Sequence, residues 1–264
     1  MKIKRIKIRS LKNTRDLGNF PAADGKKIVS GRLIRSGLLA KGKVEDVNRL
    51  ISEHNVRIVI DLRTDAEINE KPEILPETVK YIRVPMLDDS YLGIARDEYS
   101  IQCWFNLFKD CSRAPEDVFY DMYEMLVFSE RTKSLIRQIF DIFLENEEGS
   151  VLWHCSAGKD RVGVITMLLL LALGVNRELI IEDFLATNTF TRAEILKTRI
   201  FSPFVIKERR LRKCLHVLMT VKRMYLERLL QKIDAEYKDI YAFFSEQYGI
   251  SYEEIIALRN KYTV

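Results

Sequence analysis

Short apolar runs rich in β-branched residues recur along the chain and predict its strands. They cover residues 28–34, 56–60, 79–84 and 151–153, and each ends near polar or turn-forming residues. Side chains of this kind suit the pleated, half-buried surface of a sheet. We therefore expect a strand at each of the four positions.

Longer segments carry apolar residues at the three- and four-residue spacing of a helix. The stretch at 163–173 is rich in leucine and is followed by Gly174, a residue type that often lies just past a helix end. The last segment has Ser251 and Glu254 in the capping-box pattern that starts a helix. Helices are expected at residues 132–144, 163–173, 176–186, 203–239 and 251–260.

Strands interleaved with helices, followed by a helical C-terminal half, predict an α/β fold. Its central sheet should be mostly parallel and flanked by helices. The length of 264 residues suits a single domain, 1–264. Residues 91–128 are rich in aromatic side chains and poor in turn formers, so they fit this alternation badly. They are either a helical lid insertion or ordinary core and surface helices.

Composition narrows the class of protein without naming a function. With 47% hydrophobic and 31% charged residues, the chain has an ordinary globular composition, which excludes a disordered or fibrous protein. A net charge of +5 is mild, and the basic residues are spread along the chain, so no nucleic-acid partner is expected. The basic stretch 207–222 is either a packed helix with a solvated face or a contact for an anionic membrane or partner. No pattern indicates a particular oligomeric state.

Targeting and membrane patterns are not found in the sequence. The first ten residues alternate Lys or Arg with Ile, unlike a signal peptide, and the longest apolar run, 162–175, is too short to span a bilayer. The four cysteines, at 103, 111, 155 and 214, lack metal-ligand spacing and suit a reducing compartment. We expect a cytoplasmic protein without a transmembrane segment.

The chemistry is concentrated in the sequence HCSAGKDRVG at residues 154–163. Cys155 follows a predicted strand, and Arg161 stands near the start of a predicted helix. The five residues between them can curl so that successive backbone N–H groups point inward and bind a tetrahedral anion. The same amides and the positive helix end stabilise a thiolate. Cys155 is therefore the candidate nucleophile, above a phosphate-binding loop formed by Ser156, Ala157, Gly158, Lys159, Asp160 and Arg161.

Arg161 can bind two phosphoryl oxygens at once and stabilise the charge that spreads over them in the transition state. Attack by sulfur would form a phosphocysteine, and this chemistry requires neither a metal nor a cofactor because the loop supplies the positive potential. The leaving oxygen needs a proton. Asp160 is the first candidate for this general acid, and Asp61, Asp88 and Asp89 are the alternatives.

A cysteine near an arginine is more often a buried thiol beside a surface charge. Here the small residues in the loop, the glycine after the arginine and the flanking strand and helix all agree with a phosphate site, which reverses that preference. His154 is expected to orient the loop through hydrogen bonds rather than to act as an acid or base.

With these residues in view, the chain resembles the bacterial tyrosine phosphatases with an HCxxGKDR loop, a family with mycobacterial and Listeria members. Further patches match that family in order along the chain. They are NTRDLG at 13–18, DG at 24–25, GRLIRSG at 31–37, DLRT at 61–64 and DFLATN at 183–188. The resemblance runs from residue 13 to about 190, and the C-terminal helices are compatible with it but less diagnostic.

The resemblance implies a cysteine-phosphatase fold and hydrolysis of phosphotyrosine, with phosphoserine, phosphothreonine or phosphoinositides as further substrates. It implies Asp160 as the acid, and Asp61 and Arg63 as contacts to substrate. Lys159 would favour highly charged head groups if it faces the substrate, and would not if it pairs with Asp160. One departure stands out. Val162 takes the place of the usual Ser or Thr, whose hydroxyl assists hydrolysis of the intermediate, so we expect slow turnover.

Two other functions fit parts of the same pattern. A rhodanese-type sulfurtransferase also places a cysteine in an anion-binding loop, although the residues after Cys155 and the other matching patches favour phosphate. A phosphate-binding module that has lost turnover would keep the loop, and Val162 favours this alternative slightly.

Overall fold

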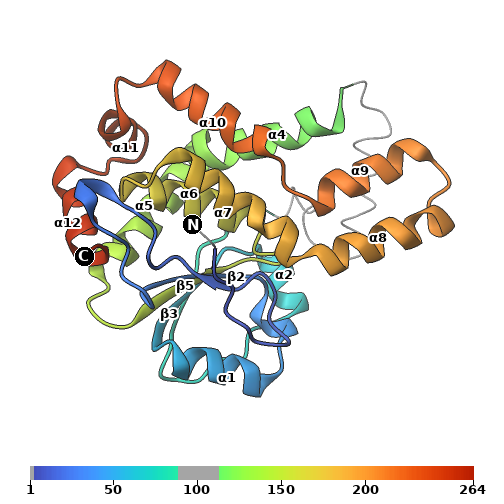
Figure 1. Ribbon diagram of the computed structural model, residues 1–264, viewed down its shortest axis with the longest axis horizontal. Coiled ribbons are helices and arrows are strands. Elements are labelled where there is room, and N and C mark those ends of the chain that lie inside the picture. The colour runs from blue at the N-terminus through green and yellow to red at the C-terminus, as the bar shows by residue number, and fades with distance from the viewer. Residues whose placement is uncertain (1–2, 89–112) are drawn as a thin grey trace.

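The computed structural model describes residues 3–88 and 113–264, and its described part is built around a five-stranded sheet (Figure 1). The strand order is β1-β2-β5-β3-β4. Only β1 runs antiparallel to its neighbour, and the other three pairs are parallel. This confirms the α/β fold with a mostly parallel sheet. The strands are β1 (Arg15–Asp16), β2 (Leu33–Ser36), β3 (Val56–Asp61), β4 (Lys80–Arg83) and β5 (Ser150–His154).

Three of the four predicted strands are confirmed as β3, β4 and β5, whereas the prediction at 28–34 is largely wrong. Strand β2 begins only at Leu33, because Gly31 takes a φ of 76° in the left-handed region and turns the chain. Ile28 instead forms an isolated bridge with Thr263, near the C-terminus. Strand β1 was not predicted, since two residues carry no readable alternation.

Helices cover both faces of the sheet. Figure 1 shows α5 (Glu130–Glu145), α6 (Asp160–Ala172) and α7 (Arg177–Phe190) on one side and α1 (Val44–Glu53) on the other. The alternation along β5 explains the two layers, because Trp153 faces the larger core while Leu152 faces the smaller core beneath α1. The short helix α2 (Asp65–Glu70) follows β3, and two 3-10 turns lie at Ala23–Gly25 and Leu39–Lys41.

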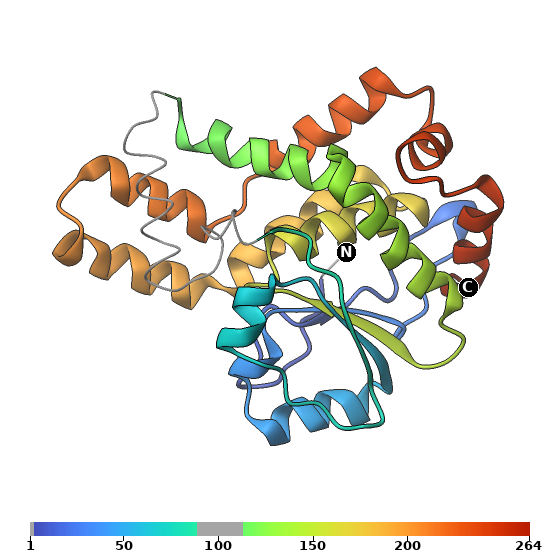
Figure 2. The ribbon, with the colours of Figure 1, turned by 180° about the vertical axis from the view of Figure 1, so that it is seen from behind.

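The segment predicted as a lid or as ordinary helices is only partly described. Its residues 91–112 lie outside the described residues, so a lid there stays a prediction. Helix α4 (Pro115–Phe128) buries Phe119, Tyr123 and Leu126 in the larger core. This part of the segment is therefore a core helix, and Figure 2 shows it running into α5 across the helical layer.

The C-terminal half is helical, as predicted, but 203–239 is not one segment. It divides into the end of α8 (Arg192–Val205), then α9 (Arg209–Met219) and α10 (Arg223–Glu236), and Pro203 lies inside α8. Helix α11 (Ile240–Tyr248) and helix α12 (Tyr252–Tyr262) follow, and the predicted capping box of Ser251 and Glu254 is confirmed at the start of α12. Helices α8 and α9 form a hairpin that projects from the body (Figures 1 and 2). No helix among the described residues combines the length and apolar character needed to span a bilayer.

Candidate active site

The loop after β5 lies at the carboxyl end of the central strand of the sheet, between β2 and β3. Cys155 follows this strand directly and is 2% exposed. Helix α6 begins at Asp160, three residues before the start that the sequence predicts, so Asp160 and Arg161 both lie in its first turn. The strand, loop and helix therefore place the sulfur and the guanidinium at one helix N-terminus.

The loop carbonyls are bound on the side away from the candidate anion site. Asn13 donates its side-chain amide to the carbonyl of Gly158 at 2.6 Å, and Arg35 donates to the same oxygen at 2.9 Å. Asn13 also donates to the carbonyl of Ala157 at 3.4 Å. A trans peptide points its N–H opposite to its C=O, so these contacts turn the N–H groups of Gly158 and Lys159 away from Asn13 and Arg35. Within the described residues, the N–H groups of Ser156, Ala157 and Gly158 donate no hydrogen bond. Such a row of amides is an anion-binding nest.

Only glycine fits at position 158. Its φ is 63°, and an added Cβ would lie 2.4 Å from the carbonyl oxygen of Ser36 and 2.6 Å from the nitrogen of Gly37. The family patch at 31–37 thus packs directly against the loop.

A buried ion network supports the loop from behind. Asp183 accepts hydrogen bonds from Arg15 at 2.7 Å and from Arg35 at 2.5 Å, and all three side chains are buried. Burial alone raises the pKa of Asp183, but the two arginines outweigh it and lower the pKa. Three patches that lie far apart in the sequence, at 13–18, 31–37 and 183–188, therefore meet behind one loop.

The guanidinium of Arg161 is held by a residue that sequence reasoning missed. Glu67 accepts from Nη1 of Arg161 at 2.6 Å and from Nη2 at 2.8 Å, and the carbonyl of Leu62 accepts from Nη1 at 3.2 Å. Nε of Arg161 is buried without a partner among the described residues. The donors left over are therefore Nε–H and the second hydrogen of Nη2, which form the side-on fork that binds two oxygens.

Glu67 is itself fixed by several contacts. It forms a capping box with Thr64 at the start of α2, with Thr64 N–H donating to Oε2 at 2.9 Å. The hydroxyl of Ser156 donates to Oε1. Burial alone raises the pKa of Glu67, but Arg161 and the hydrogen bonds outweigh it and lower the pKa to about 2. The Thr-x-x-Glu pattern was readable as a helix start, but nothing in it indicated a partner in the loop.

Asp160 lies between a phenol and an ammonium group. The hydroxyl of Tyr123 on α4 donates to Oδ1 of Asp160, and Nζ of Lys159 lies 3.3 Å from Oδ2. Burial, followed by the charge of Asp160, raises the pKa of Tyr123 well above its ordinary value, so the phenol stays a donor. Sequence reasoning missed Tyr123, because α4 lies in the segment that fitted no pattern.

The structure places Lys159 in the pairing with Asp160 that the sequence left as one alternative. Its Nζ also donates to the carbonyl of Leu218 at the end of α9, and it lies 5.5 Å from the ring centre of Phe119. The Lys159 side chain is 3% exposed. Its contacts tie the loop to the base of the α8–α9 hairpin.

The alternative candidates for the acid that the structure describes, Asp61 and Asp88, each accept a hydrogen bond from an arginine. Asp61 is fully buried, accepts from Nη2 of Arg63 at 2.6 Å and from the Tyr81 hydroxyl at 2.7 Å, and Arg63 is 1% exposed. A substrate contact by either stays a prediction, and their burial favours a supporting role. Asp88 is half exposed and accepts from Arg131 at 2.8 Å, while Asp89 lies outside the described residues.

His154 makes none of the hydrogen bonds expected of it. Neither ring nitrogen has a hydrogen-bond partner among the described residues, and Nε2 lies 3.8 Å from Asp61 and 3.7 Å from Glu73. These three side chains have the donor types of a metal site. However, Arg63 already donates to Asp61 and lies 3.2 Å from Glu73, so its guanidinium supplies positive charge there.

Comparison with known proteins agrees with this geometry. The model of the tyrosine phosphatase family matches residues 6–264. The chain belongs to the tyrosine phosphatase family.

Relatives in this family carry consistent names. A protein of Cupriavidus necator, provisionally named a tyrosine-protein phosphatase, is 29% identical over 68% of this chain and 61% of its own length. A tyrosine-protein phosphatase of Nostoc commune is 26% identical over 62% of this chain and 51% of its own length. The triple specificity protein phosphatase PtpB of Mycobacterium tuberculosis shares 50% identity over a stretch of 38 residues, 14% of each chain. The matched part thus spans about half to three fifths of the first two relatives.

Proposed function

We propose that this chain hydrolyses phosphotyrosine esters through a phosphocysteine intermediate. The observation that carries the proposal is the side-on edge of Arg161, which is buried without a hydrogen-bond partner among the described residues and lies at the same helix start as Cys155. The other donors of Arg161 are bound by Glu67 and Leu62. The loop amides without a hydrogen-bond partner supply the remaining positive potential for a phosphate dianion.

The first step forms a bond between Sγ of Cys155 and phosphorus while the bond from phosphorus to the phenolic oxygen breaks. Asp160, in its protonated form, gives its proton to that departing oxygen. In the second step water attacks the phosphorus, Asp160 takes the proton from the water, and the sulfur leaves as a thiolate. Arg161 and the loop amides bind the equatorial oxygens through both steps.

Tyr123 and Lys159 hold the carboxyl group of Asp160 in place for these transfers. Holding the acid in place raises the rate of proton transfer, because the proton donor does not have to be brought into position. Tyr123 acts through Asp160 and is therefore a positioning residue.

Phosphoserine, phosphothreonine and phosphoinositide esters are further substrates to test. The triple-specificity name belongs to the mycobacterial relative, and it comes to this chain only as part of this proposal. The buried contacts of Lys159 favour phosphotyrosine, because the ammonium must leave Asp160 and Leu218 before it can bind a second phosphate.

The deciding experiment compares wild type with Cys155→Ser in the presence of a chelator. The substrates are a chromogenic phosphate ester, phosphotyrosine and phosphoserine peptides, and phosphoinositides. We expect hydrolysis by the wild type, a phosphocysteine trapped by acid quench, and loss of both in the variant. Equal rates in the two proteins would remove Cys155 from the mechanism.

Two further measurements separate the alternative functions. Sulfur transfer from thiosulfate to cyanide without ester hydrolysis would indicate a rhodanese-type enzyme. Binding of a phosphopeptide by the wild type without turnover would indicate a binding module.

A further inference from the structure

Helix α8 has an apolar face that the described residues leave largely exposed. It has no buried residue along its whole length. A helix in a protein normally owes its stability to burial of one face, so an uncovered apolar face indicates an absent partner. Of the nine exposed large apolar side chains among the described residues, five lie on α8: Leu196, Ile200, Phe201, Phe204 and Val205.

The most exposed of these side chains lie at the far end of the hairpin. Phe204 is 82% exposed and Val205 is 81% exposed, and both directly precede the turn into α9. Figure 1 shows that this turn is the part of the hairpin most distant from the sheet. The tip can therefore meet a flat surface without interference from the body.

The same hairpin carries an excess of positive over negative side chains. Residues 192–219 contain eight Lys or Arg and only two Asp or Glu, an excess larger than the net charge of +5 for the whole chain. The other 35 Lys and Arg are spread along the chain, as expected, but 36 Asp and Glu there balance them. The remainder of the chain is close to neutral, so an anionic surface would attract the hairpin in preference to other parts.

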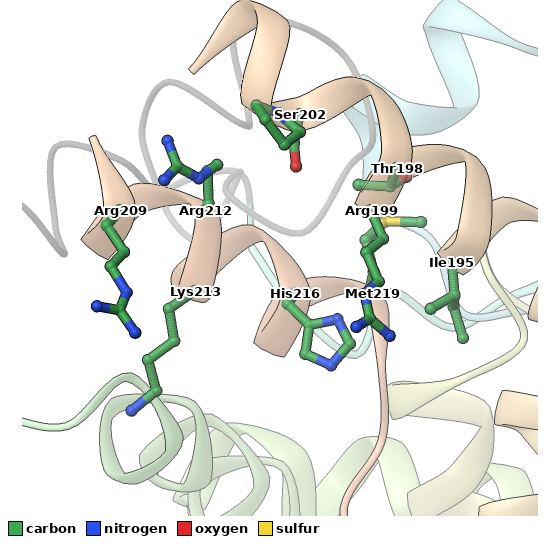
Figure 3. Close-up of a pocket in the computed structure, with 10 residues that line it drawn as sticks. Ile195, Thr198, Arg199, Ser202, Arg209, Arg212, Lys213, His216 and Met219 are labelled. Carbon is green, nitrogen blue, oxygen red and sulfur yellow. The ribbon is translucent and has the colours of Figure 1, made fainter. Parts of the chain in front are cut away.

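A basic cavity of about 580 Å³ opens between α8 and α9. Arg199 on α8 and Arg209, Lys213 and His216 on α9 are among its lining residues, and Figure 3 shows Arg199 and His216 between the two helices. Lys213 also lies 3.4 Å from Oε2 of Glu116. Arg199 and Arg209 form no ion pair with an acidic side chain of the described residues. The hydroxyl of Ser202 also lines the cavity. Guanidinium and hydroxyl donors of this kind suit a phosphate group.

We propose that the α8–α9 hairpin docks onto an anionic phospholipid bilayer. Phe204 and Val205 enter the boundary between head groups and acyl chains, and the basic side chains of the cavity contact lipid phosphates. A basic face adjoining an apolar one is the pattern of elements that lie on a membrane surface. A protein partner with an apolar groove would leave the concentrated positive charge without a counterpart.

Docking would bring the candidate active site to the membrane. Lys159 in the loop donates to the carbonyl of Leu218, so the base of the hairpin adjoins the site. Phosphate esters carried by lipids or by membrane-bound proteins would then be within reach. The docking itself needs no catalysis and does not depend on the proposed function.

The test is co-sedimentation of the full chain with vesicles. We expect binding to phosphatidylcholine vesicles that contain phosphatidylserine, little binding to phosphatidylcholine alone, and release at high salt. Phe204→Ser with Val205→Ser should weaken binding at least about tenfold. Arg199→Gln with Arg209→Gln should weaken it about 25-fold, at about fivefold per charge. The matched control, Ile74→Ser with Tyr252→Ser, removes exposed apolar side chains elsewhere and should bind as wild type does.

Several outcomes would overturn the proposal. These are no binding to either vesicle, equal binding to both, or hairpin variants that bind as tightly as wild type. Light scattering without lipid tests whether a second copy of the chain covers the apolar face instead of a bilayer. A dimer that Phe204→Ser converts to monomer would show that it does. Cys155→Ser should bind vesicles normally, and the hairpin variants should hydrolyse a water-soluble ester at the wild-type rate, so loss of docking and loss of catalysis are distinguishable.

Discussion

Glu67 binds the guanidinium of Arg161 through two hydrogen bonds, of 2.6 and 2.8 Å, and so decides which edge of the arginine remains for substrate. The pair is buried, with side-chain exposures of 4% and 1%. Burial lowers the pKa of Arg161, but the charge of Glu67 outweighs this and raises it. The arginine is therefore fixed in both orientation and charge before any phosphate arrives.

Replacing this carboxylate should impair catalysis. Glu67→Gln keeps the shape of the side chain but removes its charge. One of its two hydrogen bonds to Arg161 is then lost, because the amide NH₂ group and the guanidinium are both donors. We expect kcat/KM for a phosphotyrosine peptide to fall about 100-fold, the size of effect that a small misplacement of a reacting group produces. Glu70→Gln, on the exposed side of the same helix, is the matched control. A rate within twofold of wild type for Glu67→Gln would argue against positioning.

The same residue should make stability depend on acid. The pKa of Glu67 is about 2 in the folded protein against an ordinary 4.5, so its contribution is present above about pH 4.5 and lost as the pH falls toward 2. The shift corresponds to roughly 3 kcal/mol of unfolding free energy. Urea titrations at pH 6 and at pH 3 should show a larger loss for wild type than for Glu67→Gln. Equal losses would place the acid dependence elsewhere, with Asp61 the next candidate, since its pKa is also about 2.

Tyr123 should matter most for esters with poor leaving groups. Tyr123→Phe removes the hydroxyl that donates to Asp160, and the acid is then held less well. We expect a roughly tenfold loss on esters of weakly acidic phenols, where protonation of the leaving oxygen limits the rate, and little loss on an activated nitrophenyl ester. Tyr120→Phe on the same helix is the control, because its ring stacks under Arg228 and that contact survives the change. A uniform loss across leaving groups would contradict the positioning role.

Val162 should slow the second chemical step. It is fully buried in the first turns of α6 and offers no hydroxyl to assist departure of the sulfur. Rapid-quench measurements should show a burst of product followed by a slower steady state, and Val162→Thr should raise the steady rate several-fold. Val164→Thr, an equally buried change on the same helix, should not. The absence of a burst, combined with no gain from threonine, would speak against slow hydrolysis of the intermediate.

The features predicted correctly from the sequence are those that depend on residues close together in the chain. The strand at β5, the loop and the start of α6 lie within about a dozen residues, so their types and spacing restrict where Cys155 and Arg161 can lie. The α12 capping box is equally local. The errors occur where distant contacts compete with local pattern, as when Ile28 pairs with Thr263 instead of continuing β2.

The amino-acid sequence thus determined the α/β class, the loop and the two residues placed at its ends. Only the tertiary structure decided what holds them: Glu67 reaches Arg161 across 94 positions of the chain, and Tyr123 reaches Asp160 across 37. The tertiary structure also brings the basic residues of α9 beside the apolar face of α8, so that they form one surface. The physical reason is that the chemistry of a side chain depends on its residue type alone. The partner of a buried charge depends on how elements that are distant in the sequence pack together.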